Sequence, residues 1–332
     1  MADLKVTYMG IELKNPVVAG ASDLTANIDS IKQIEDAGAG AVVLKSLFEE
    51  QIQLEGARLE AEMNQHADLH AESTSFFPDI EHSGPEGHLL SVAKVKESVK
   101  IPVIASLNAV NRDTWTEWAR KLADTGVDAL ELNFFANPDM QAADGAAIEK
   151  DQIATVKEVV ASVHIPVSIK MSVFYTAPLA MAREFADAGA KGLVLFNQFF
   201  QPDIDPLHET STIQMSLSAN NTYRLPLRYA GLLYGETGAS IAGSSGIMDG
   251  MDTAKMLLAG ADVVQVVSTL YRNKTSQIGN IVSELGNWMD AKGYATLSDF
   301  QGKMSKKNSS DPWAYKRAQY VDMLMKRDPL GA

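Results

Sequence analysis

A short phrase, in which a glycine precedes a run of apolar residues, recurs four times and constrains the fold more than any other feature. The copies cover residues 38–45, 126–133, 189–197 and 260–267. In each copy the glycine is placed to end a helix and the apolar run to form a short buried strand. A second phrase, Ile-Pro before an apolar run, lies at 101–107 and 165–170, and further apolar runs lie at 16–20 and 239–243. Together these segments predict eight strands.

Helical patterns fill the gaps between the strands, at 115–125, 148–163, 178–188 and 251–259. Alternating strands and amphipathic helices predict parallel βαβ units. Eight units in one run favour a closed (β/α)8 TIM barrel, an α/β fold, over the alternative of a doubly wound open sheet. Residues 6–13 predict a hairpin that turns near Gly10 and closes the bottom of the barrel. We expect the barrel to span 1–302 and a C-terminal helical extension to span 303–332.

Composition excludes several classes of function. The net charge of −13 argues against binding to nucleic acid or to an anionic membrane, since both need clustered Lys and Arg. The chain has no cysteine, which excludes disulfides, thiolate metal sites and an iron–sulfur cluster held by this chain. Its first residues lack the apolar core of a signal peptide, and no apolar run is long enough to span a membrane. We therefore predict a cytoplasmic protein.

Two turns rich in small residues follow the last two predicted strands. They read Gly-Ser-Ser-Gly-Ile at 243–247 and Val-Val-Ser-Thr at 266–269. Small residues let backbone N–H groups approach a ligand, and turns after strands 7 and 8 of such barrels bind phosphate. Ordinary βα turns also contain small residues. The favoured interpretation is a phosphate cradle made by Ser244, Ser245, Gly246, Ser268 and Thr269.

Polar side chains stand at the carboxyl ends of the other predicted strands, where this fold carries its chemistry. They are Lys45, Ser46, Asn108, Asn133, Lys170 and Asn197. Buried lysines and amides need partners, so this ring suits a planar heterocycle with carbonyl groups or an anionic intermediate. Two other readings stay open. The lysines could extend to solvent at the rim, or one could form a Schiff base in a lyase or aldolase that acts on a phosphate ester.

At these residues the chain resembles the FMN-dependent dihydroorotate dehydrogenases. The resemblance runs from Lys14–Val18 to Phe300–Lys303 and is strongest over 239–303. It implies FMN as the cofactor, hydride transfer from dihydroorotate or a related small cyclic substrate to the flavin, and a place in pyrimidine biosynthesis. It also implies an external electron acceptor, and it suggests a homodimer.

The resemblance assigns roles residue by residue. Ala21 and Ser22 correspond to the small residues under the flavin ring, and Lys45 with Ser46 corresponds to the Lys-Ser pair of strand 2. Lys170 corresponds to the lysine of strand 5 that contacts the flavin. Asn133 and Asn197 correspond to the asparagines of strands 4 and 6 that hold the substrate, so Lys45, Asn133 and Asn197 are the candidate catalytic residues, while Asn108 joins the cofactor site.

One departure from the family concerns the general base. The family carries a Cys or Ser in the loop after strand 4, and here the segment 132–138 reads Leu-Asn-Phe-Phe-Ala-Asn-Pro, with Ala136 at that position. Alanine accepts no proton, so the base comes from elsewhere or is absent. A flavin-binding protein that has lost dihydroorotate oxidation is therefore a further alternative. We predict no metal site and interpret His66 and His70 as part of an exposed acidic helix.

Overall fold

A computed structural model describes residues 2–54, 85–134, 144–198, 203–212 and 217–310, together with Tyr315 and Met325. All eight predicted strands are present and parallel. They are β3 (Val17–Ala19), β4 (Ala41–Val43), β6 (Val103–Asn108), β7 (Ala129–Asn133), β8 (Val167–Lys170), β9 (Gly192–Leu195), β12 (Ser240–Ser244) and β13 (Val263–Val266). Each pairs with two neighbours, and the β13–β3, β3–β4 and β4–β6 pairings close the ring. The fold is the predicted barrel, and closure excludes the open sheet.

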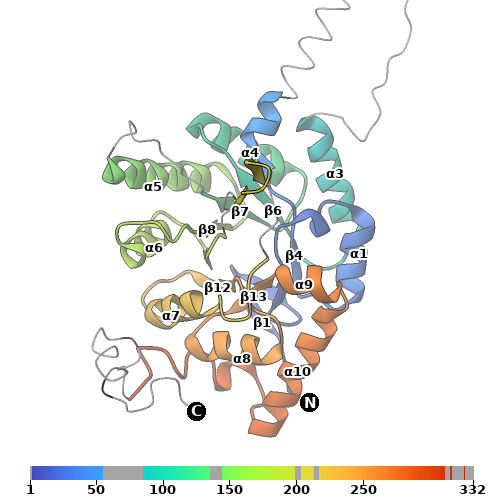
Figure 1. Ribbon diagram of the computed structural model, residues 1–332, viewed down its shortest axis with the longest axis vertical. Coiled ribbons are helices and arrows are strands. Elements are labelled where there is room, and N and C mark those ends of the chain that lie inside the picture. The colour runs from blue at the N-terminus through green and yellow to red at the C-terminus, as the bar shows by residue number, and fades with distance from the viewer. Residues whose placement is uncertain are drawn as a thin grey trace, which may run out of the picture.

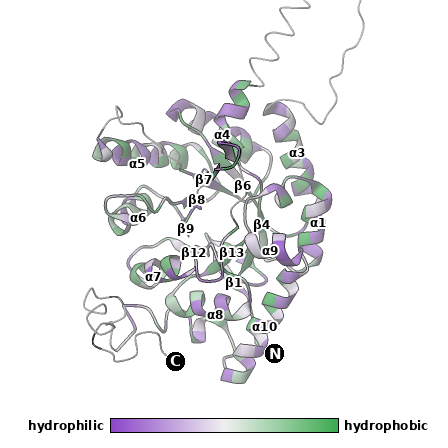
Figure 2. Cartoon of the chain, viewed as in Figure 1, coloured by the Kyte–Doolittle hydropathy of each residue, from purple (hydrophilic) through white to green (hydrophobic). Residues whose placement is uncertain are grey.

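Helices surround the ring of strands (Figure 1). They are α1 (Ile28–Asp36), α3 (Pro85–Ser98), α4 (Arg112–Asp124), α5 (Gly145–Ser162), α6 (Pro178–Asp187), α7 (Arg224–Leu233), α8 (Gly250–Ala259) and α10 (Gln277–Lys292). The four helical segments predicted between strands are confirmed to within a few residues. Each helix mixes apolar and polar residues along its length (Figure 2), as expected where one face packs on the barrel and the other meets water.

The recurring glycine acts as the sequence predicts. It has a left-handed φ in all four copies, for example +97° at Gly38 and +125° at Gly260. The backbone N–H of Gly260 donates to the carbonyls of Met256 and Leu257 at the end of α8. A residue with this φ stops the helix and turns the chain into the next strand, and a side chain there would strain the backbone.

The N-terminal hairpin closes the bottom of the barrel. It comprises β1 (Val6–Tyr8) and β2 (Ile11–Leu13), and its turn residues Met9 and Gly10 both have a positive φ. Buried side chains of the hairpin pack against barrel residues such as Val43 and Ile104. This confirms the predicted hairpin and leaves the carboxyl ends of the strands as the open end.

Several smaller elements were not predicted. A short strand, β5 (Leu47–Phe48), pairs with the end of β6. Another hairpin, β10 (Asp203–Asp205) and β11 (Thr210–Thr212), interrupts the long loop after β9. Two 3-10 turns, η1 (Asp23–Thr25) and η3 (Leu297–Asp299), and the short helix α9 (Ser268–Asn273) complete the described elements. None of the described helices has both the length and the apolar character needed to cross a membrane.

Candidate active site

A cavity of about 260 Å³ lies at the carboxyl ends of the barrel strands. It gathers most of the side chains that the sequence singles out. The predicted residues that line it are Ala21, Ser22, Lys45, Ser46, Asn133, Lys170, Asn197, Ser244, Ser245, Gly246 and Ser268. They come from segments spread over more than two hundred residues of sequence, and barrel closure brings them around one space.

The two lysines of the cavity differ in their surroundings. Lys45, just after β4, pairs with Asp23 at 2.7 Å between Nζ and Oδ1, and both side chains are about half exposed. Lys170, at the end of β8, is buried, and its Nζ lies 3.7 Å from Oε1 of the buried Glu131. Rim exposure therefore describes Lys45 but not Lys170, whose ammonium group is held below the mouth of the cavity.

The turn after β12 has an unusual backbone. Ser245 and Gly246 have φ values of +73° and +71°. A left-handed conformation is uncommon for serine and costs free energy, so it persists where the surrounding structure or a ligand requires it. The Oγ atom of Ser268, in the neighbouring turn, accepts a hydrogen bond of 2.9 Å from the backbone N–H of Ser218. The two turns thus meet the loop before α7 at one end of the cavity.

Other predicted residues lie apart from the cavity or outside the described residues. Asn108 is buried where β5 pairs with β6, and it does not line the cavity. The Thr269 hydroxyl donates to the carbonyl of Met248 at 3.0 Å, and Thr269 does not line the cavity either. Ala136 and the histidines at 66 and 70 are outside the described residues.

Sequence reasoning missed several residues of the cavity wall. They include Asp23, Gln198, Ser218, Gln265 and Tyr271. Gln265 could have been predicted from the sequence, because it is a polar residue inside the apolar run of β13. The ion pair of Asp23 with Lys45 could not be predicted, because no local spacing specifies which charged groups meet at the mouth of a barrel.

Three residues that line the cavity each have a buried polar atom that lacks a hydrogen-bond partner within the described part of the chain. These atoms are Asn133 Oδ1, Gln265 Oε1 and the Tyr271 hydroxyl. Buried polar groups without partners are costly, so such atoms in residues that line a cavity indicate a ligand that supplies the missing bonds. Amide oxygens accept from N–H groups and a phenol can donate to a carbonyl. The flat, amide-like edge of a flavin ring offers both, so the residues present fit this cofactor.

Comparison with known proteins agrees with this geometry. A sequence model of the family described as dihydroorotate dehydrogenase matches residues 3–289. The chain belongs to the dihydroorotate dehydrogenase family. It is therefore a flavin oxidoreductase that acts on CH–CH donors.

Relatives named for such activities align over most of the chain. The catalytic subunit of dihydroorotate dehydrogenase B (NAD(+)) from Thermoplasma volcanium is 28% identical over 311 residues, 91% of this chain and 98% of that protein. The corresponding subunit from Thermoplasma acidophilum is 28% identical over 310 residues, with 91% and 99% covered. The chloroplastic dihydropyrimidine dehydrogenase (NADP(+)) of Arabidopsis thaliana is 25% identical over 327 residues, with 90% and 76% covered.

A buried carboxylate, Glu49, holds two segments together at one edge of the site. Glu49 directly follows β5, whose Phe48 lines the cavity. Its Oε2 atom accepts hydrogen bonds from the backbone N–H groups of Val110 and Asn111, at 2.5 and 2.9 Å. Burial raises the pKa of Glu49, but these two bonds, together with bonds from the side chains of Asn111 and Thr114, outweigh it and hold the pKa below its usual value. The carboxylate therefore ties the segment after β5 to the beginning of α4.

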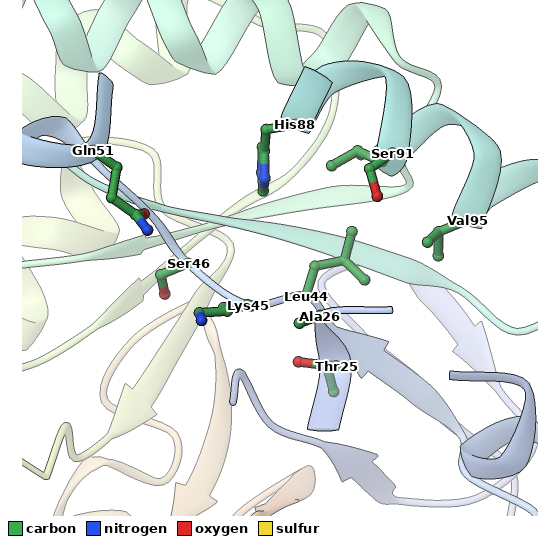
Figure 3. Close-up of a pocket in the computed structure, with 10 residues that line it drawn as sticks. Thr25, Ala26, Leu44, Lys45, Ser46, Gln51, His88, Ser91 and Val95 are labelled. Atoms are coloured by element: carbon green, nitrogen blue, oxygen red, sulfur yellow. The ribbon is translucent and has the colours of Figure 1, made fainter. Parts of the chain in front are cut away.

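A smaller cavity of about 150 Å³ lies beside the main one, between the end of β4 and α3 (Figure 3). Lys45 and Ser46 line both cavities. From α3, the side chains of His88 and Ser91 point into the smaller one (Figure 3). Burial lowers the pKa of His88 to about 4, so its imidazole is neutral at pH 7.

The half-buried imidazole of His88 makes stability depend on pH. His88 takes up a proton near pH 6.5 in the unfolded chain but only near pH 4 in the folded protein. The unfolded state thus binds more protons between these values, and stability is lost as the pH falls from 6.5 to 4. We expect this loss to be about 2 kcal/mol, since water reaches part of the ring.

Denaturant unfolding of wild type and His88→Gln at pH 7.5, 6.0 and 4.5 measures this contribution. The difference in unfolding free energy between the two proteins should change with pH in the direction that favours the variant at low pH. A difference that stays constant over this range would contradict the prediction.

Proposed function

We propose that this chain binds FMN in the main cavity and uses it to oxidise a small cyclic amide, dihydroorotate or a close relative, to an orotate-like product. The proposal rests above all on one observation. Asn133, Gln265 and Tyr271 each have a buried polar atom without a partner among the described residues, and they line a cavity that two lysines also line. A planar ring rich in carbonyl and N–H groups satisfies this set, and the family supplies such a ring as its flavin.

The proposed binding mode uses both ends of the cavity. Ser244, Ser245, Gly246 and Ser268 form its polar, glycine-containing end, where hydroxyl and backbone N–H groups suit a phosphate. Ala21 and Ser22 leave room for a flat ring. When bound, FMN supplies the hydride acceptor. The cationic side chains of Lys45 and Lys170 then stabilise negative charge that develops on the ring.

In this proposal, amide side chains bind the substrate. Asn133 and Asn197 stand at the ends of β7 and β9 on the cavity wall. Their side chains donate to carbonyls and accept from N–H groups, which suits a cyclic amide or imide. The activities for which the relatives are named support this substrate class, since dihydroorotate and a dihydropyrimidine are both reduced pyrimidine rings.

An external acceptor completes the proposed cycle. The relatives named for NAD(+) are described as catalytic subunits. By analogy, we propose that electrons leave this chain for a separate acceptor, carried by a partner protein or free in solution, and that the protein acts in pyrimidine biosynthesis in the cytoplasm, as a homodimer.

Two measurements test the proposal. Protein purified with added FMN should be yellow and should release one flavin per chain on denaturation. Mixed anaerobically with dihydroorotate or dihydrouracil, it should lose its visible flavin absorbance. A colourless protein that borohydride links covalently to a keto substrate would overturn FMN binding in favour of a Schiff-base lyase. Yellow protein that no reduced pyrimidine bleaches would overturn the substrate class and favour a flavin-binding protein without this activity.

A further inference from the structure

A buried carboxylate lies inside the barrel, below the main cavity. Glu131 stands on β7, two residues before Asn133, and is fully buried. Because side chains of a strand alternate between its two faces, Glu131 and Asn133 point to the same side of β7. Asn133 lines the cavity, and Glu131 lies one layer deeper.

Glu131 contacts two side chains that do reach the cavity. Its Oε2 atom accepts a hydrogen bond of 2.6 Å from Nε2 of Gln265 on β13, across the barrel. Its Oε1 atom lies 3.7 Å from Nζ of Lys170 on the adjacent strand β8. The same Oε1 atom has no hydrogen-bond partner among the described residues. The carboxylate therefore links the floor residues Gln265 and Lys170 without touching the cavity itself.

The electrostatic effect of Glu131 also reaches the hairpin plug. Burial, first, and then the negative charge of Glu131 raise the pKa of the Tyr8 hydroxyl well above its usual value. Tyr8 thus stays neutral, and Lys170 is the basic side chain that pairs with Glu131 among the described residues. A buried charge without a partner is strongly destabilising, whereas a nearby opposite charge offsets much of that cost.

We infer that Glu131 is a positioning residue that neutralises Lys170 and orients Gln265, so that the floor of the cavity presents a balanced ion pair to the ring of the cofactor. This rests on the proposed binding of FMN. The reduced flavin is anionic near neutral pH, so a free cation below the ring would favour it. By compensating Lys170, Glu131 keeps the bound flavin from being held too tightly in its reduced form.

The first test measures FMN binding in both redox states. The redox ratio is the dissociation constant of oxidised FMN divided by that of reduced FMN. In Glu131→Gln this ratio should rise about tenfold, and the midpoint potential of the bound FMN should rise with it. Lys170→Met should shift the ratio in the opposite direction. The double variant, which has neither charge, should return to within about threefold of wild type. An unchanged or lowered ratio in Glu131→Gln, or a double variant that resembles Lys170→Met, would overturn the inference.

A matched control removes another carboxylate from the barrel without touching the cavity. Asp262 is largely shielded from water and accepts hydrogen bonds from the backbone of Ile241 and from Gln301. Asp262→Asn disturbs a comparable number of hydrogen bonds, but Asp262 does not line the cavity. We therefore expect the redox ratio of this variant to stay within twofold of wild type. A shift equal to that of Glu131→Gln would show a general effect of destabilisation and overturn the specific role.

The second test needs no cofactor and separates failure of this inference from failure of FMN binding. Unfolding of the apoprotein is measured for wild type, Glu131→Gln, Lys170→Met and the double variant. If the two residues compensate each other, each single change leaves a buried charge alone, and the double variant loses less stability than the sum of the single losses. Additive losses would overturn the pairing even if FMN binds. If the stability losses are not additive but the protein takes up no FMN, the pairing of Glu131 with Lys170 stands and the proposed cofactor is rejected.

Discussion

Replacement of Gly246 by alanine is expected to weaken FMN binding about a hundredfold. Gly246 has a φ of +71°, a conformation that strains any residue with a Cβ atom. A Cβ atom there would also lie 2.7 Å from the backbone nitrogen of Tyr223 and 2.9 Å from the carbonyl oxygen of Ala219. Both neighbours are backbone atoms, which cannot rotate away. The turn after β12 must therefore shift, and with it the proposed phosphate end of the cavity.

The chain offers a matched control for this change. Gly238 lies just before β12, has no positive φ, and a Cβ atom built on it meets nothing within 4 Å. Gly238→Ala should bind FMN as wild type does and keep its stability to within about 1 kcal/mol. Isothermal titration with FMN compares the three proteins. Equal affinity in Gly246→Ala and wild type would show that the ligand does not use this turn.

The barrel itself could be predicted from the sequence because its determinants are local. Each strand is a short apolar run, and four of the eight follow a glycine that must stop the preceding helix. Chain order then dictates that parallel strands neighbour one another, so their polar ends converge without further information. Lys45, Asn133, Lys170 and Asn197 line one cavity for this reason.

The partners of these side chains could not be predicted in the same way. Glu131 and Gln265 meet across the barrel although 134 positions separate them. Which inward side chains touch depends on strand stagger and barrel width, which no local spacing encodes. Asn108 also depends on such tertiary detail. It stands at a strand end and pairs with Phe48 of the short strand β5, and Phe48 lines the cavity while Asn108 does not.

Replacement of Ala136 by cysteine is expected to speed flavin reduction by dihydroorotate 10²- to 10⁴-fold, the usual contribution of a positioned general base. The family resemblance places a Cys or Ser at this position, where the chain has a residue that accepts no proton. Oxidation across a carbon–carbon bond removes a hydride from one carbon and a proton from the next. If the cavity already binds FMN and the substrate ring, the missing proton acceptor limits the rate. Anaerobic stopped-flow spectroscopy of the flavin absorbance measures it.

The composition of the chain makes this gain easy to attribute. Wild type has no cysteine, so the introduced thiol is unique and iodoacetamide should abolish the gain while leaving FMN bound. The rate should rise with pH as the thiolate forms, around pH 8.5 for an unperturbed thiol. Ala136→Ser should give a smaller gain, and Ala136→Val, which has no proton acceptor, none. If the cysteine and valine variants reduce flavin equally slowly, then dihydroorotate does not sit against this loop, and the natural substrate is a ring whose oxidation needs no base from this position.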